Sequence, residues 1–171
     1  MMTASTLANA LDDLGNVDNE AAVLNSWAAS YTAYMMESLV NGISPLNSSL
    51  FASCETAMKS AMVGISASGA GGAKIVAGVK AYWGAVALAF ATIWILVPPL
   101  ITFSVLPTGV LTPGAELAFQ GNLEAVFLSN TSGSLSRVDA YAAIASIIHS
   151  NSSGAMVIQS TVPTTTTWPV L

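Results

Sequence analysis

The chain has 171 residues, of which 53% are hydrophobic and only 8% are Asp, Glu, Lys or Arg, and its formal net charge is −5. This length fits one domain with its own core, but an ordinary soluble domain carries about 25% charged residues. A surface so poor in charge must be covered by other protein or by lipid, unless Ser, Thr and Asn supply its polar groups. Cover by protein and cover by lipid both stay open.

The distribution of charge and cysteine excludes several classes of function. Binding a nucleic-acid backbone needs a cluster of basic side chains. The four bases are scattered along the chain: Lys59, Lys74, Lys80 and Arg137. The single cysteine, Cys54, excludes an internal disulfide and a Cys-rich metal site. The N-terminus has no basic region followed by an apolar stretch, so we expect no secretory signal and synthesis in a cytoplasm.

Two helices are predicted in the N-terminal part of the chain. The first covers Ser5–Leu14, with leucines at helical spacing, and stops at Gly15. The second begins after Asp18, which has the character of an N-cap, and ends at Asn41-Gly42. Its apolar side chains step by three and four residues: Leu24, Trp27, Tyr31, Met35 and Leu39.

The middle of the chain predicts two more helices joined by a glycine-rich hinge. The third helix has one apolar face from Leu46 to Ile65, and residues 66–72, S-A-S-G-A-G-G, read as the hinge. The fourth runs from Ala73 to Val97 and ends at Pro98-Pro99. It carries a ridge of small residues, which we expect at a close helix contact: Ala73, Ala77, Ala81, Ala85 and Ala89.

The last third of the chain predicts two helices and extended segments. Residues 100–113 read as an extended, packed connection, and Thr112-Pro113 opens a fifth helix that ends near Asn130. A weak capping box at Ser136 and Asp139 opens a sixth, ending at Asn151. Residues 156–162 predict a strand and residues 163–171 an extended arm. We expect this arm to find its partner in another subunit, and an arm that folds back over its own domain is the alternative. The predicted fold is thus mainly α: a domain of about six helices over residues 1–162, with a short C-terminal strand, and an arm over 163–171.

No residue pattern predicts catalysis, a cofactor or a metal site. His149 is the only histidine, so a Ser-His-Asp or Cys-His site would have to use it, but no spacing connects it with Cys54. A histidine near a helix C-terminus more often interacts with the last carbonyls. Glu116 and Glu124 lie two turns apart, where two carboxylates more often solubilise a surface than frame a site. Metal-ligand spacings are missing as well, so we expect no enzyme, no cofactor and no metal.

The glycines at residues 69–72, followed by Lys74, have the ingredients of a phosphate-binding loop but not its pattern. That pattern needs lysine directly after glycine and then a hydroxyl, whereas Ala73 intervenes and Ile75 follows. A hinge is the favoured interpretation.

A membrane segment is the main alternative to a protein-covered surface. The 35 residues from 81 to 115 all lack a formal charge, and Lys74 and Lys80 lie just before them. The helical part, residues 81–97, has 17 residues, which is the lower limit of about 17 to 25 for a spanning helix. Pro98-Pro99 then interrupts it, and lipid does not tolerate the non-helical backbone that follows. A small integral membrane protein with one hydrophobic segment near 81–101 therefore stays open as the second hypothesis.

The order of several features resembles small structural proteins of tailed-phage virions. These features are W-A-A-S-Y-T-A-Y over 27–34, the hinge before K-A-Y-W-G-A over 80–85, the P-T-G-V-L-T-P connection, and the terminal T-W-P-V-L. The resemblance implies a helical head-to-tail connector, neck or capsid-associated subunit in the virion, assembled in the host cytoplasm with copies of itself and other virion proteins. In such subunits a terminal arm commonly inserts into a neighbour, and no catalytic or binding residue carries over.

We therefore expect a non-catalytic structural subunit of a symmetric assembly. The candidate subunit-interface residues lie in the arm and on the alanine ridge: Trp168, Val170, Leu171, Ala81 and Ala85.

Overall fold

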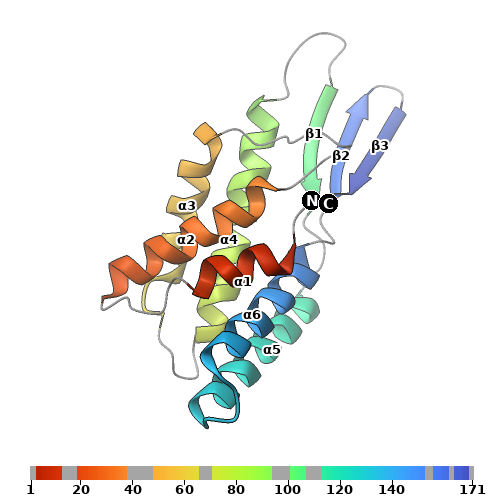
Figure 1. Ribbon diagram of the computed structural model, residues 1–171. Coiled ribbons are helices and arrows are strands. Elements are labelled where there is room, and N and C mark those ends of the chain that lie inside the picture. The colour runs from red at the N-terminus through yellow and green to blue at the C-terminus, as the bar shows by residue number, and fades with distance from the viewer. Residues whose placement is uncertain are drawn as a thin grey trace.

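The protein is mainly helical (Figure 1). The computed structural model describes residues 3–12, 19–37, 48–65, 71–93, 101–106, 113–152, 156–161 and 164–169. Six helices lie in these ranges: α1 (Ala4–Asp12), α2 (Glu20–Met36), α3 (Ser48–Met62), α4 (Gly71–Ile93), α5 (Pro113–Thr131) and α6 (Arg137–Ser152). Three short strands accompany them: β1 (Ile101–Leu106), β2 (Met156–Thr161) and β3 (Thr164–Pro169).

The predicted number and order of helices are confirmed, and the differences lie at their ends. Helix α4 begins at Gly71, so Gly71 and Gly72 belong to its first turn and not to the hinge. Helix α2 ends at Met36, and the predicted stop at Asn41-Gly42 lies outside the described residues, as do Pro98-Pro99.

Hydrogen bonds at two helix starts explain where the chain becomes helical. Asn19, and not Asp18, caps α2: its backbone is extended and its Oδ1 accepts the N–H of Ala22 at 2.9 Å. The capping box before α6 is confirmed, because Ser136 Oγ accepts the N–H of Asp139 at 3.1 Å and donates to its carboxylate at 2.6 Å.

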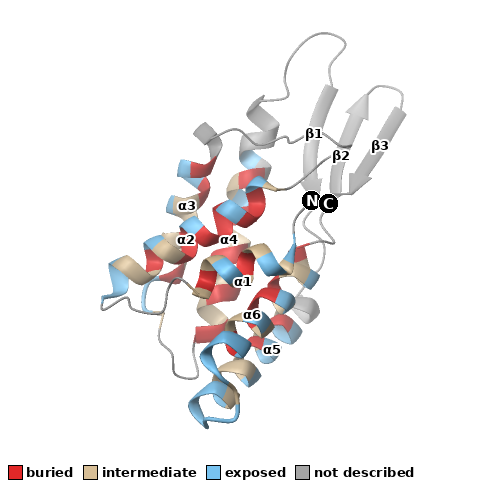
Figure 2. Cartoon of the chain, viewed as in Figure 1, coloured by how far each residue is buried: buried red, intermediate tan, exposed pale blue. Residues whose placement is uncertain are grey.

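Helix α2 is buried on more than the predicted face (Figure 2). The expected residues Leu24, Trp27, Tyr31 and Met35 are buried. So are Ala28 and Tyr34 on the same face, and also Ser30 and Thr32, which point in other directions around the helix. Helix α2 contacts both α1 and α3. A helix covered on several sides has to bury polar residues, and these need hydrogen-bond partners.

The close approaches of α4 to its neighbours lie at glycines. A Cβ atom on Gly78 would clash with Met62 Cγ of α3, and one on Gly72 would lie 3.1 Å from the Gln120 carbonyl oxygen of α5. The ridge alanines Ala81 and Ala85 are half-buried instead. The residues that the structure places fully inside on α4 are larger ones, including Tyr82 and Trp83. The described close approaches of α4 thus lie at glycines, and Gly78 is on the same side of the helix as Ala81 and Ala85, which follow it by three and seven residues.

These contacts predict opposite effects of alanine at two glycines of α4. Gly78→Ala is expected to destabilise the fold by about 1 to 3 kcal/mol, because the new methyl group overpacks against Met62 and Met58. Gly84→Ala, with nothing within 4 Å of its new Cβ, is expected to stabilise it by up to about 1 kcal/mol through helix propensity. Guanidinium unfolding of both variants measures the difference. Equal effects would contradict the described α3–α4 packing.

The three strands form one antiparallel sheet in the order β1-β2-β3. Ile101 of β1 pairs with Thr161 of β2, and Met156 of β2 pairs with Pro169 of β3. The predicted extended connection therefore contains β1, and the predicted strand is β2. The arm is extended over residues 164–169, and it has a partner in its own chain, because β3 pairs with β2. The favoured expectation of an arm without such a partner is therefore wrong, and the pairing agrees with the alternative in which the arm folds back on its own domain.

Candidate functional site

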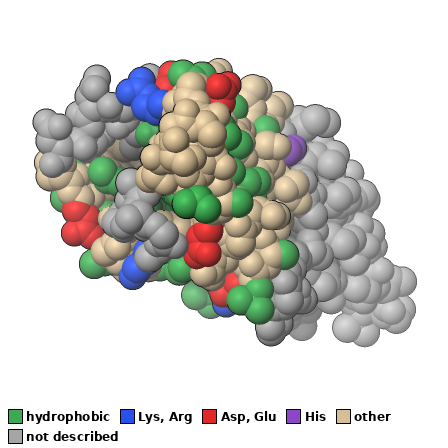
Figure 3. All heavy atoms as spheres, turned by 90° about the horizontal axis from the view of Figure 1, so that it is seen from below, with side chains coloured by type: hydrophobic (Ala, Val, Ile, Leu, Met, Phe, Trp, Pro, Cys, Tyr) green, Lys and Arg blue, Asp and Glu red, His purple; other side chains and the backbone are tan. Residues whose placement is uncertain are grey.

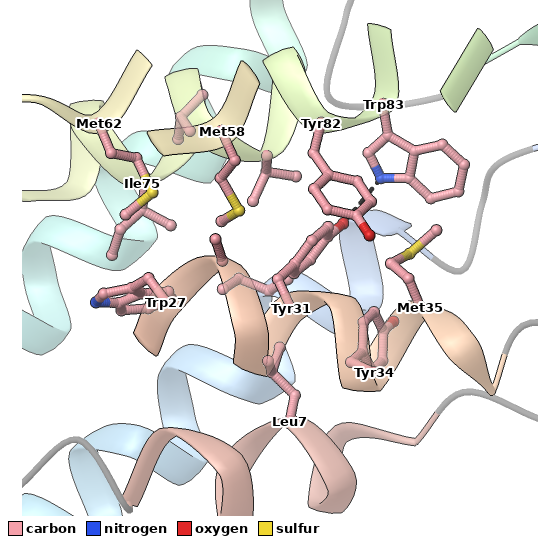
Figure 4. Packing of buried hydrophobic residues seen from close by; sticks show 14 of the residues in the cluster. Leu7, Trp27, Tyr31, Tyr34, Met35, Met58, Met62, Ile75, Tyr82 and Trp83 are labelled. Atoms are coloured by element: carbon pink, nitrogen blue, oxygen red, sulfur yellow. Dashed lines mark hydrogen bonds between the residues drawn. The ribbon is translucent and has the colours of Figure 1, made fainter. Parts of the chain in front are cut away.

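The most polar part of the core is a group of buried phenols between α2, α4 and α6. Tyr31 of α2 lies at its centre (Figure 4), and its hydroxyl accepts the indole N–H of Trp83 of α4 at 2.9 Å. The same hydroxyl shares a hydrogen bond of 3.0 Å with Ser152 Oγ at the end of α6. One phenol thus joins three helices that are far apart in the sequence.

Two further phenols extend this group on either side of Tyr31. Tyr82 of α4 packs edge-on against Tyr31, with ring centroids 4.8 Å apart, and shares a hydrogen bond of 3.0 Å with Thr32 Oγ1. Tyr34 lies 5.6 Å from Tyr31 by ring centroids, and its hydroxyl lies 2.9 Å from His149 Nδ1. Each of these buried hydroxyls therefore has a partner. We call Tyr31, Tyr34, Tyr82 and Trp83 the aromatic core.

The electrostatic setting of the aromatic core favours neutral phenols. Burial raises the pKa of Tyr31, Tyr34 and Tyr82 well above the ordinary value of 10, and in each case it is the largest cause. A phenol that acts as a base or nucleophile needs the opposite shift. The arrangement is suited to holding three helices together through neutral hydrogen bonds.

The structure separates the residues that a Cys-His site would need to bring together. Cys54 is buried in α3, where burial raises the pKa of its thiol and disfavours the thiolate. His149 is half-buried in the last turn of α6 and has the Tyr34 hydroxyl as its described partner. The sequence-based expectation that His149 meets the last carbonyls of its helix is replaced by this contact between helices.

The two acids of α5 each have a partner within the helical part of the protein. Glu116 forms an ion pair with Lys80 of α4 at 2.8 Å. Glu124 accepts a hydrogen bond from Gln120 at 2.7 Å and lies against Gly72 at the start of α4. They therefore do not converge on a common site. Within the described residues, no group of three or more His, Cys, Asp or Glu side chains is placed to hold a metal ion.

The glycine-rich segment before α4 is described only from Gly71 onward. Gly72 is buried and serves the close packing of α4 on α5, because a side chain there would meet backbone atoms of Gln120 and Glu124. Lys74 is half-buried in the same first turn. Residues 66–70, which carry the rest of the hinge prediction, lie outside the described residues.

The candidate interface residues from the sequence fall into two places that the structure does not bring into one described surface. Ala81 and Ala85 are half-buried on α4. Trp168 lies in β3, opposite Val157 of β2 in the strand pairing. Val170 and Leu171 lie outside the described residues.

An exposed apolar face on α5 is the feature that sequence periodicity missed. Leu117 is 70% exposed and Leu128 is 71% exposed, although Leu117 belonged to the apolar series of the predicted helix. Between them lie the exposed residues Ala118, Gly121, Asn122 and Ala125. We call these six residues the α5 face. None of the six carries a charge, and the two acids of α5 contact Lys80 and Gln120.

Charge is also sparse on other parts of the surface. Figure 3 shows separate patches of acidic and basic side chains among hydrophobic and uncharged polar groups on one face of the molecule. Further large apolar side chains are exposed elsewhere, including Leu88 on α4 and Val63 after α3. The low charge of the sequence is thus seen on the surface as well as in the core.

None of the described helices combines the length and the apolar character that crossing a bilayer requires.

Comparisons with known proteins give no relative from which a role can be read. No family model matches the chain, and searches of curated proteins and of solved structures found no match.

Proposed function

We propose that this chain is a non-catalytic structural subunit that repeats in a symmetric assembly, and that the assembly is a tailed-phage virion. The observation that carries the first part is the α5 face, where two leucines about 70% exposed flank small uncharged residues. Exposed apolar surface without charge is typical of protein–protein contacts.

The interior supports a scaffolding role for the fold. The aromatic core joins α2, α4 and α6 by paired hydroxyls, and the phenols in it have raised pKa values. Such a network of satisfied, buried hydrogen bonds makes the fold rigid. A rigid unit loses less conformational freedom when it joins an assembly.

The virion setting rests on the sequence resemblance described above. It places the subunit at a neck, a head-to-tail connector or the capsid, with copies of itself and other virion proteins as partners. The alternative of a small integral membrane protein with a hydrophobic segment near 81–101 is kept as an outcome of the experiment below.

The proposal predicts that charge on the α5 face blocks assembly without unfolding the protomer. Leu117→Glu and Leu128→Glu should each leave the unfolding free energy within about 0.5 kcal/mol, because the side chains are exposed. Each should weaken association at least about 100-fold, because an unpaired carboxylate would be buried in the contact. Sedimentation velocity of the purified full chain measures the association.

Val63→Glu is the matched control, since Val63 is an exposed apolar residue away from α5. It should sediment as the unaltered protein does. If Leu117→Glu and Leu128→Glu also sediment as the unaltered protein does, the α5 face is not the contact between subunits. If the unaltered chain is monomeric at all concentrations, the assembly proposal is wrong. Quantitative recovery in carbonate-washed membranes would favour the membrane alternative.

A further inference from the structure

We propose that two copies of this chain pair through the outer edge of β3, so that the three-stranded sheets of two subunits continue into one six-stranded sheet. This inference deepens the proposed function, on which it rests, by naming the partner of the C-terminal segment as the same segment of a second copy.

The position of β3 in the sheet supplies the first step. Strand β2 lies between β1 and β3, and β1 is the strand that contacts α4. Figure 1 shows β3 on the side of the sheet away from α4. Among the described strands, β3 therefore has a neighbour on one side only. An edge strand offers a row of backbone donors and acceptors that another extended strand can satisfy.

The composition of β3 supplies the second step. Natural edge strands are commonly protected from such pairing by charged side chains, especially lysine. The sheet has no charged residue in any of its three strands, whose sequences are ITFSVL, MVIQST and TTTTWP. The four consecutive threonines of β3 are β-branched and favour the extended conformation.

The strands carry no charge that would oppose a second copy at this edge. Each copy carries a net charge of −5, and all nine acids and all four bases lie outside the strands. Two copies that meet at β3 thus place no like charges opposite one another within the sheet. A basic or acidic peptide finds no opposite charge in the strands to select it.

Proline fixes which backbone groups of β3 face the open side. Pro169 has no N–H, and proline is tolerated in a sheet where its nitrogen faces away from the ladder. In an antiparallel strand, residues two apart point their N–H groups to the same side. The N–H groups of Thr167 and Thr165 therefore face the outer edge together with the Pro169 nitrogen.

This orientation predicts the register of the pair. Two antiparallel β3 strands related by a twofold axis satisfy the outward groups of both copies when Thr165 of one faces Thr167 of the other. Thr166 then lies on the axis, opposite its own counterpart. A residue on the axis has its Cα about 4.5 to 5.5 Å from the same residue of the second copy, which is a distance that a disulfide can bridge.

A cysteine scan of the full chain tests the register. Thr164→Cys, Thr165→Cys, Thr166→Cys and Thr167→Cys are oxidised mildly, and disulfide-linked dimers are measured. Dimer formation should peak at Thr166→Cys and fall on both sides, because one step off the axis the two Cα atoms are about 8 Å apart. The unaltered chain gives the background, since its single thiol, Cys54, is buried. Equal cross-linking at all four positions, or none above background, would overturn the proposal.

A backbone variant tests the hydrogen bonds themselves. Thr167→Pro removes an outward N–H and should lower the association constant at least about 10-fold by sedimentation, whereas Thr167→Val keeps this N–H and should associate normally. If Thr167→Pro associates normally and the scan shows no peak, the β3 pairing is wrong while the assembly proposal stands. If the unaltered chain does not associate at all, the proposed function fails with it.

Discussion

Above about pH 10 the three buried tyrosines of the aromatic core are expected to cost the protein about 4 kcal/mol of unfolding free energy for each further pH unit. The three buried tyrosines of the aromatic core, Tyr31, Tyr34 and Tyr82, all have pKa values raised by burial. In the unfolded chain they return to the ordinary value of about 10. Each proton that the unfolded state releases and the folded state keeps contributes about 1.4 kcal/mol per pH unit, so three of them give about 4.

The sign follows from which state holds the protons. Below the unfolded pKa both states are protonated, so the contribution to stability is fully present. Between the unfolded and the folded pKa, the folded state binds more protons than the unfolded state, so the stability falls as the pH rises. The loss therefore begins near pH 10 and continues toward the raised folded values.

Guanidinium unfolding curves between pH 8 and pH 11 measure this slope, and tyrosinate absorbance reports ionisation directly. Tyr82→Phe is a useful variant, because it removes one titrating group and should reduce the slope by about one third. Tyr141 is only half-buried, although burial raises its pKa as well, so it is the tyrosine expected to ionise first in the folded state. If all four tyrosines ionise near pH 10 with the fold intact, the described burial of the aromatic core is wrong.

Local signals in the sequence were sufficient to predict the helices. Apolar spacing, the Ser136–Asp139 capping box and the Thr112-Pro113 signal gave six helices in the right order, because these features act within a few residues of the backbone they control. The exact ends were less accurate. Asn19 and Asp18 are both good N-caps by type, and the backbone conformation around Asn19 decides between them.

The arrangement of the helices around α2 was not available from the same signals. Thr32 lies off the apolar face of α2 and Tyr34 lies at its edge, yet both are buried, because the helix is covered on several sides. Their partners Tyr82 and His149 come from other helices. Periodicity reports one face of one helix and contains no information on which distant helix covers the others.

The same limit explains the alanine ridge and the arm. Small residues on α4 indicate where a neighbour can approach, but both its alanines and its glycines qualify, and the structure places the close contacts at Gly72 and Gly78. Strands β2 and β3 are separated by two residues, Val162 and Pro163, a spacing that suits a hairpin. The usual Asn-Gly or Gly-containing turn signal is missing from these residues, so the sequence alone suggested an arm without a partner.

Replacing Trp83 by alanine is expected to lower the unfolding free energy by about 3 to 5 kcal/mol, a large part of the about 5 to 15 kcal/mol of a typical domain. Trp83 is one of the largest fully buried side chains, and its loss leaves a cavity beside Tyr31. Trp83→Phe separates packing from hydrogen bonding, because it keeps an aromatic ring and removes only the N–H donor with part of the ring. It should lose only about 1 to 2 kcal/mol, since the Tyr31 hydroxyl keeps its bond to Ser152.

A double-mutant cycle with Tyr31→Phe then isolates the Trp83–Tyr31 hydrogen bond. Tyr31→Phe alone leaves the buried indole N–H without its acceptor, which costs about 1 to 3 kcal/mol. In the double variant both partners are apolar, so the combined loss should be smaller than the sum of the two single losses. Strictly additive losses in guanidinium unfolding would mean that the two side chains do not interact, and the hydrogen bond that joins α2 to α4 would then have to be abandoned.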